Sequence, residues 1–125
     1  PQMLVEVGKA TSSLGMNRFV KDASALVLIT LEPTNITSKL GCGIKDKDFP
    51  MMDLGIASAY ITLAAEAEGI GSCILGWFDE KKIKELVGIP KKKRLMLIIS
   101  LGYNLKPKRK KIRKDFDKVV SFEKY

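Results

Sequence analysis

Residues 53–90, DLGIASAYITLAAEAEGIGSCILGWFDEKKIKELVGIP, carry the pattern of a long helix, a short strand and a second helix. The first helix is predicted over residues 53–67, with Asp53 as its N-cap, because a carboxylate can accept the free N–H groups of a first turn. Gly69 suits the left-handed position just past the helix end. The polar residues of this helix recur every four positions and form one narrow stripe: Ser58, Thr62 and Glu66. A helix that is apolar on its remaining surface must be covered nearly all round, which indicates the central core or a subunit interface.

The second half of this stretch predicts a short strand followed by a capped helix. SCIL, residues 72–75, is an apolar run of strand length. Asp79 is the predicted N-cap of a helix over Glu80–Val87, which Gly88 and Pro90 are expected to end.

Further helix and strand segments are predicted on both sides. Gln2–Ala10 is expected to form a short helix, and Ala23–Thr30, rich in branched residues, a strand buried on both faces. Glu32–Pro50 is dense in turn-forming residues and predicts a long connection. The apolar run Arg94–Gly102 predicts a central strand, and Tyr103–Tyr125 an extended arm with a short element near its end. The chain therefore mixes α and β structure.

The composition indicates one globular domain, residues 1–125, and excludes several chemistries. Apolar residues make up 46% and charged residues 29%, which is not a disordered composition, and no apolar run approaches the ~20 residues of a bilayer span.

The cysteines and the amino-terminal sequence predict where the protein is found. Two cysteines without a CxxC spacing, and no signal-peptide pattern, predict a reducing, cytoplasmic location. Cys42 lies in a Gly-Cys-Gly loop, and Cys73 is expected to serve for packing in its strand. The absence of histidine removes Ser-His and Cys-His nucleophilic pairs and most zinc sites, so an enzyme of this sequence is expected to rely on a cofactor.

The glycines within residues 68–79 approach two nucleotide-binding motifs but match neither. A P-loop needs Lys and then Ser or Thr after its last glycine, and two aromatic residues follow Gly76 instead. A dinucleotide fingerprint needs a third glycine where Ile74 stands, and a strand rather than a helix before the first. Gly69 and Gly71 are therefore interpreted as helix-end and turn residues. At Gly76 a turn and the close approach of a flat ligand both remain open.

One order of features runs from about Phe19 to Val120. An Asp-led, Ala-rich helix is followed by a Gly-x-Gly-Ser turn, an apolar-Gly-aromatic-Asp segment and a helix ending in Gly-Ile-Pro. A strand ending in Leu-Gly-Tyr and a basic stretch with Lys-x-Arg come next. In this order and spacing the sequence resembles the FMN-dependent nitroreductase family.

The resemblance implies an α+β sandwich, with a central, mainly antiparallel sheet flanked by helices, and an intertwined homodimer with FMN at the subunit interface. The backbone of Leu75 and Gly76 would lie beside the isoalloxazine ring and hydrogen-bond its reactive nitrogen. Lys111 and Arg113 would reach the FMN phosphate, which a guanidinium fork suits. Enzymes of this kind take a hydride from NAD(P)H and then reduce a small acceptor, such as a nitro compound or a quinone.

The amino-terminal part of the family pattern has no counterpart in this sequence. Family members open with an Arg-Ser-x-Arg type segment and continue with an Asn-x-Gln-Pro-Trp type segment, and neither is present here. We therefore expect the chain to be a piece of a longer protein, with a single nitroreductase-like domain that is incomplete at its N-terminus. A flavin-less structural or interaction module of the same fold is the alternative function.

The net charge of +8 comes mostly from KPKRKKIRK, residues 106–114, which holds seven cations and no acid. Such a segment could neutralise nucleic-acid phosphates in a salt-dependent manner. It has no aromatic residues for base stacking, and the rest of the chain is almost neutral. A nucleic-acid-binding module is therefore ranked last, and a solvated arm is the plainer interpretation.

Overall fold

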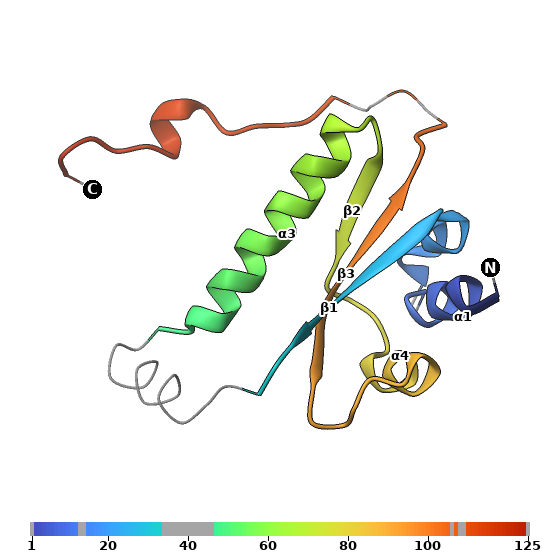
Figure 1. The fold of residues 1–125 in the computed structure, drawn as a ribbon. Coiled ribbons are helices and arrows are strands. Elements are labelled where there is room, and N and C mark those ends of the chain that lie inside the picture. Colours follow the sequence, from blue (N-terminus) through green and yellow to red (C-terminus); the bar gives the residue numbers. More distant parts are fainter. Residues whose placement is uncertain (1, 13–14, 34–46, 106, 108–109, 125) are drawn as a thin grey trace.

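The computed structural model describes residues 2–12, 15–33, 47–105, 107 and 110–124. Its elements, in chain order, are α1 (Gln2–Ala10), the 3-10 helix η2 (Arg18–Asp22), β1 (Ala25–Leu31), α3 (Phe49–Ala67), β2 (Gly71–Leu75), α4 (Glu80–Val87), β3 (Arg94–Gly102) and the 3-10 helix η3 (Phe116–Lys118). Figure 1 shows α3 on one side of the sheet and α1 and α4 on the other. This arrangement confirms the α+β class and an antiparallel sheet flanked by helices.

β3 is the central strand of the sheet. The strand order is β1-β3-β2, and both pairings are antiparallel. β2 pairs from Gly71 opposite Gly102 to Leu75 opposite Ile98. The predicted central position of Arg94–Gly102 is thus confirmed, and the carboxyl end of β2 lies against a fully buried residue of β3.

The main core lies between the sheet and the helices α1 and α4. Its buried members are Val7, Ala10, Val20, Leu75, Ile83, Leu95 and Ile98. Burying each large aliphatic side chain of this kind contributes about 1.5–3 kcal/mol, so this cluster holds α1 and α4 to the sheet.

Strands β1 and β2 are less buried than the sequence predicts. β1 begins at Ala25, two residues later than expected, and its other residues are only half-buried rather than enclosed on both faces. Cys73 in β2 is exposed, so its predicted role in packing is wrong. Both strands lie at the edges of the described sheet, where described neighbours cover them from one side only.

Helix α3 begins earlier than predicted. Its N-cap is Asp48, whose Oδ1 accepts from the Met51 N–H at 3.3 Å, and Asp53 lies inside the helix. Pro50 explains the difference, because its fixed φ suits the first turn of a helix and its missing N–H would have no partner there. Beyond the other end of α3, Gly69 has the predicted left-handed conformation, with φ of 71°.

The predicted caps of α4 are both confirmed. Asp79 Oδ1 accepts from the Lys82 N–H at 3.0 Å, as an N-cap should. Gly88, at the C-cap, has φ of 72°, and its N–H donates to the carbonyl of Lys84.

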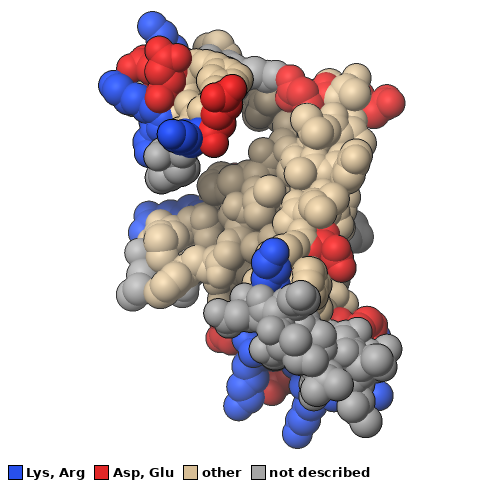
Figure 2. All heavy atoms as spheres, turned by 90° about the vertical axis from the view of Figure 1, so that its left-hand side faces the viewer, with Lys and Arg blue, Asp and Glu red and all other residues tan. Residues whose placement is uncertain are grey.

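Helix α3 buries only Leu54, Ser58 and Ala65 and leaves large apolar side chains exposed. Ser58 is turned inward, at 2% exposure, and its hydroxyl donates to the Leu54 carbonyl at 2.8 Å. The large apolar side chains that point outward on one face are Phe49, Met52, Ile56, Tyr60 and Leu63. Figure 2 shows a broad area without charged side chains on this side of the molecule. We call these five residues the outer face of α3.

The predicted arm with a short element near its end is confirmed. After β3 the chain leads away from the sheet, carries η3 and ends far from the body (Figure 1). Its apolar side chains are exposed, among them Leu105, Ile112, Phe116 and Phe122, and the rings of the last two lie 6.4 Å apart.

Part of the predicted features lies outside the described residues. These are most of the connection Glu32–Pro50, with Cys42, and three cations of the basic segment, Lys106, Lys108 and Arg109. Within the described ranges, no helix is both long and apolar enough to cross a membrane.

Candidate functional site

The candidate site is the segment that leaves β2, residues 75–79. Leu75 closes the strand, and its side chain is buried in the core, so only its backbone can meet a ligand. Gly76 and Trp77 are exposed, and Phe78 packs half-buried against the core. The segment therefore presents main chain and one aromatic ring at the surface, directly after a strand anchored in the sheet.

The described protein gives no reason for a glycine at position 76. Its φ is not in the left-handed region, so an L side chain would not strain the backbone. A Cβ placed there would meet only Leu97 Cδ2, at 3.9 Å, which is an ordinary van der Waals contact. The space above Gly76 is open, and a flat group can approach the main chain closely at this point.

Gly71 differs from Gly76 in this respect. A Cβ at Gly71 would lie 2.7 Å from Oδ1 of the exposed Asn104 side chain, so the space at Gly71 is occupied within the chain itself and Asn104 would have to move. Gly71 is also the first residue of β2, and its prediction as a turn residue is wrong. Of these two glycines, only Gly76 has open space through which a ligand could approach the main chain.

Two hydrogen bonds hold the segment after Gly76 to the amino-terminal part of the chain. The Asp79 N–H donates to the Ala10 carbonyl at 3.0 Å, and Asn17 Nδ2 donates to the Trp77 carbonyl at 3.0 Å. The backbone of residues 75–79 is thus fixed both by the sheet and by the α1–η2 region. The contact of Asn17 with this segment cannot be predicted from the sequence, because Trp77 lies sixty positions further along the chain and no local sequence pattern indicates the contact.

A carboxylate behind the segment joins α4 to β3. Glu80 accepts from Arg94 Nε at 2.9 and 3.1 Å and from the Leu95 N–H at 3.0 Å. The hydrogen bond from Arg94 is the main reason why the pKa of Glu80 lies below its ordinary value of 4.5, although partial burial opposes it. Glu80 is therefore charged at neutral pH and ties the first turn of α4 to the start of β3.

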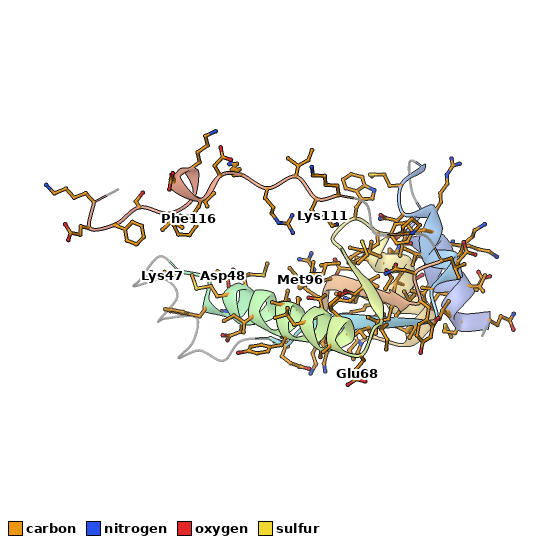
Figure 3. The ribbon with its side chains drawn as sticks, turned by 90° about the horizontal axis from the view of Figure 1, so that it is seen from above. Lys47, Asp48, Glu68, Met96, Lys111 and Phe116 are labelled. Carbon is orange, nitrogen blue, oxygen red and sulfur yellow. The ribbon has the colours of Figure 1, made fainter. Side chains whose placement is uncertain are left out.

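The four predicted site residues fall on two separate parts of the chain. Leu75 and Gly76 belong to the body, whereas Lys111 and Arg113 lie exposed on the arm. Within the described part of the chain, neither cation forms an ion pair or joins the segment 75–79. Figure 3 shows Lys111 and Phe116 on the arm, beyond the helix and sheet that carry Asp48 and Met96. The role of the two cations stays a prediction.

A resident metal finds no support in the described ranges, since no three His, Cys, Asp or Glu side chains gather there as a cluster that could hold one. What the segment offers is exposed main chain, an open space and the exposed ring of Trp77, which suit an aromatic organic group.

The sheet order, the flanking helices and the segment after β2 together define a nitroreductase-type α+β fold. The Nitroreductase family matches residues 2–103, and the chain belongs to this family.

Solved structures with this fold cover nearly the whole chain. An FMN-dependent nitroreductase from Clostridium difficile R20291 is 26% identical, with a TM-score of 0.71, and the match covers 99% of this chain and 70% of that one. NADPH:FMN oxidoreductase from Vibrio harveyi, complexed with NAD+, is 19% identical with a TM-score of 0.73, over 99% of this chain and 55% of that one. A nitroreductase family protein from Clostridium novyi NT is 23% identical with a TM-score of 0.65, and the match covers 82% of this chain and 56% of that one.

The chain spans little more than half the length of several of these proteins: 56% of the Clostridium novyi protein and 54% of Bacillus megaterium NfrA1. The comparison with curated proteins finds no match.

Proposed function

We propose that this chain forms the ring-binding part of an FMN-dependent NAD(P)H oxidoreductase. The observation that carries the proposal is Gly76: it follows directly on a strand end fixed in the core, and neither its backbone conformation nor the described side chains around it require a glycine. A flat ring lying on the main chain would require one. Family membership and the FMN-dependent relative from Clostridium difficile support the same cofactor.

The residues of this chain would bind and orient the cofactor rather than react themselves. The main chain of Leu75 and Gly76 would lie along the isoalloxazine ring, and the buried Leu75 side chain would hold that backbone in place. Lys111 and Arg113, which have no ion pair within the described residues, would supply positive charge for the phosphate. Bound FMN supplies hydride exchange between NAD(P)H and a small acceptor, such as a nitro compound or a quinone.

A second copy of the chain is the proposed partner. The outer face of α3 exposes five large apolar side chains, with Tyr60 at 71% and Leu63 at 66% exposure, and the arm exposes further ones. Monomeric proteins rarely leave contiguous apolar surface of this kind in water. A homodimer that covers the α3 face and takes up the partner's arm would also allow Lys111 and Arg113 to approach the partner's segment 75–79.

The dimer has a direct test in solution. Replacing Leu63 by Glu would place a charge in the proposed interface and shift the mass measured by light scattering towards the monomer. Lys81→Glu, a charge change on the exposed surface of α4, is the control and should leave the mass unchanged. A monomeric wild-type protein at micromolar concentration would contradict the dimer.

The cofactor has a test that does not depend on the acceptor. The purified protein, or the protein after incubation with FMN and gel filtration, should show flavin absorbance with a fixed flavin-to-protein ratio, and added NADH or NADPH should bleach it. A colourless protein that retains no added FMN would refute the enzyme function for this chain. It would leave the flavin-less interaction module, which the exposed apolar face and arm favour over nucleic-acid binding. The proposal retains the cytoplasmic location predicted from the sequence.

A further inference from the structure

Asn17 has an unusual backbone conformation beside the candidate site. Its φ of 55° and ψ of 23° lie in the left-handed region, just before η2. Asparagine tolerates this region better than most residues other than glycine. From this position the half-buried side chain reaches the segment that follows β2.

The amide group of Asn17 joins two distant parts of the main chain. Nδ2 donates to the Trp77 carbonyl at 3.0 Å and makes a longer contact of 3.4 Å to the Thr11 carbonyl. Both neighbours can only accept hydrogen bonds, so the NH2 end of the amide must face them. The side-chain NH2 group of Asn17 therefore bridges Thr11, just after α1, and the segment 75–79.

This hydrogen bond leaves very little chain free at the proposed ring site. Leu75 is fixed by its pairing with Ile98 in the sheet, and the Trp77 carbonyl is fixed by Asn17. The next anchor is the hydrogen bond from the Asp79 N–H to the Ala10 carbonyl. Only Gly76 lies between the first two anchors, and glycine is the residue with the greatest freedom to change its conformation.

We propose that Asn17 is a positioning residue: through the Trp77 carbonyl it holds the Gly76 main chain in the conformation that receives the flavin ring. The consequence for the flavin rests on the proposed function, whereas the anchoring of Trp77 does not. Without this contact, the segment would lose one of its anchors next to a flexible glycine, and the protein would have to order it further whenever the cofactor binds.

The experiment uses two substitutions at Asn17 and one control. Asn17→Asp keeps the shape of the side chain but offers oxygen to two carbonyls, so it can donate no proton while ionised. Asn17→Gly removes the side chain and accepts the left-handed backbone without strain. Ser12→Ala is the matched control, because the Ser12 hydroxyl contacts the carbonyls of Gly8 and Asn17 in the same loop but does not contact Trp77.

The first readout needs no cofactor. Trp77 is the only tryptophan of the chain, so its fluorescence reports on this segment alone. In the FMN-free protein, both Asn17 variants should show a larger acrylamide quenching constant for Trp77 than the wild type, and Ser12→Ala should not. Unchanged quenching in folded Asn17 variants would overturn the proposal. Should both variants fail to fold, the side-chain amide protons of Asn17 in the wild type decide it: exchange with solvent as fast as in a free asparagine would overturn it.

The second readout is the affinity for FMN, measured by titrating flavin fluorescence. Loss of one hydrogen bond that orders the site should raise the Kd about 5-fold in both Asn17 variants. A looser Trp77 with an unchanged Kd would overturn the positioning role. A wild-type protein that binds no FMN would instead refute the proposed function, and the quenching result would still decide whether Asn17 anchors the segment.

Discussion

Replacement of Gly76 by Ala should separate binding of a flavin from stability of the fold. The added Cβ would meet only Leu97 Cδ2, at 3.9 Å, and the backbone is not left-handed, so the FMN-free protein has room for the methyl group. An alanine at such a position reduces the freedom of the unfolded chain and should raise the free energy of unfolding by about 0.4–1 kcal/mol. A ring lying on the main chain would clash with the same methyl group.

The expected loss of binding follows from the cost of overpacking. An extra methyl group in a closely packed contact costs about 1–3 kcal/mol, which corresponds to a Kd for FMN about 5- to 150-fold higher. Stability and affinity should thus change in opposite directions in one variant. The assays are thermal unfolding without FMN, followed by circular dichroism, and fluorescence titration with FMN.

Gly71→Ala is the matched comparison for this experiment. Its Cβ would lie 2.7 Å from Oδ1 of the exposed Asn104 side chain, which must move, so this variant should gain less stability than Gly76→Ala. Two results would show the reasoning to be wrong: a Gly76→Ala protein that binds FMN as tightly as the wild type, or one that unfolds more easily than the wild type without any cofactor.

Three further predictions concern charge and capping. Because hydrogen bonding to Arg94 lowers the pKa of Glu80 in the folded state, Glu80 stabilises the fold fully above its ordinary pKa of 4.5, and this contribution is lost as the pH falls through the lowered value. Glu80→Gln should therefore lower the thermal midpoint at pH 7, and its midpoint should differ less from that of the wild type at pH 3. An equal difference in midpoint at both pH values would contradict a stabilising role of the charged Glu80 carboxylate. Lys111→Ala and Arg113→Ala should each weaken FMN binding about 10-fold or more, as loss of a charged hydrogen bond does. Lys118→Ala, on the same arm, should leave FMN binding unchanged. Equal weakening in all three variants would mean that the arm contributes only its overall positive charge and no specific contact with the phosphate. Asp48→Ala should cost about 0.5–2 kcal/mol of stability, as loss of an N-cap does, and Asp53→Ala much less; the reverse order would restore the cap predicted from the sequence.

The elements that local chemistry defines could be predicted from the sequence. Asp79 and Gly88 bound α4 as expected, because a cap depends on residues within one turn of the helix end. The predicted start of α3 is wrong, because Asp48 and Asp53 are both plausible N-caps and the position of Pro50 decides between them. The central position of β3 followed from its long apolar run.

What the sequence could not provide are contacts between distant segments. The hydrogen bond from Asn17 to Trp77 joins residues sixty positions apart, and neither residue type predicts it. The inward orientation of Ser58 was equally hidden, because a serine that bonds to its own helix can be buried where a polar stripe would be expected to face water. Whether Lys111 and Arg113 meet the ring-side segment depends on chain pairing, which a single sequence does not encode locally.

The outer face of α3 has a consequence for the life of the newly made chain. With Ile56, Tyr60 and Leu63 turned outward, a chain that has folded alone still carries a surface that adheres to any other apolar surface it meets. In the proposed homodimer a second chain covers this face. The time that a chain spends alone would then depend on the local concentration of identical chains, and slow synthesis would favour loss to chaperones, proteases or aggregates over pairing. Yield in the cell would then be set by the timing of encounters between chains as much as by the strength of the core.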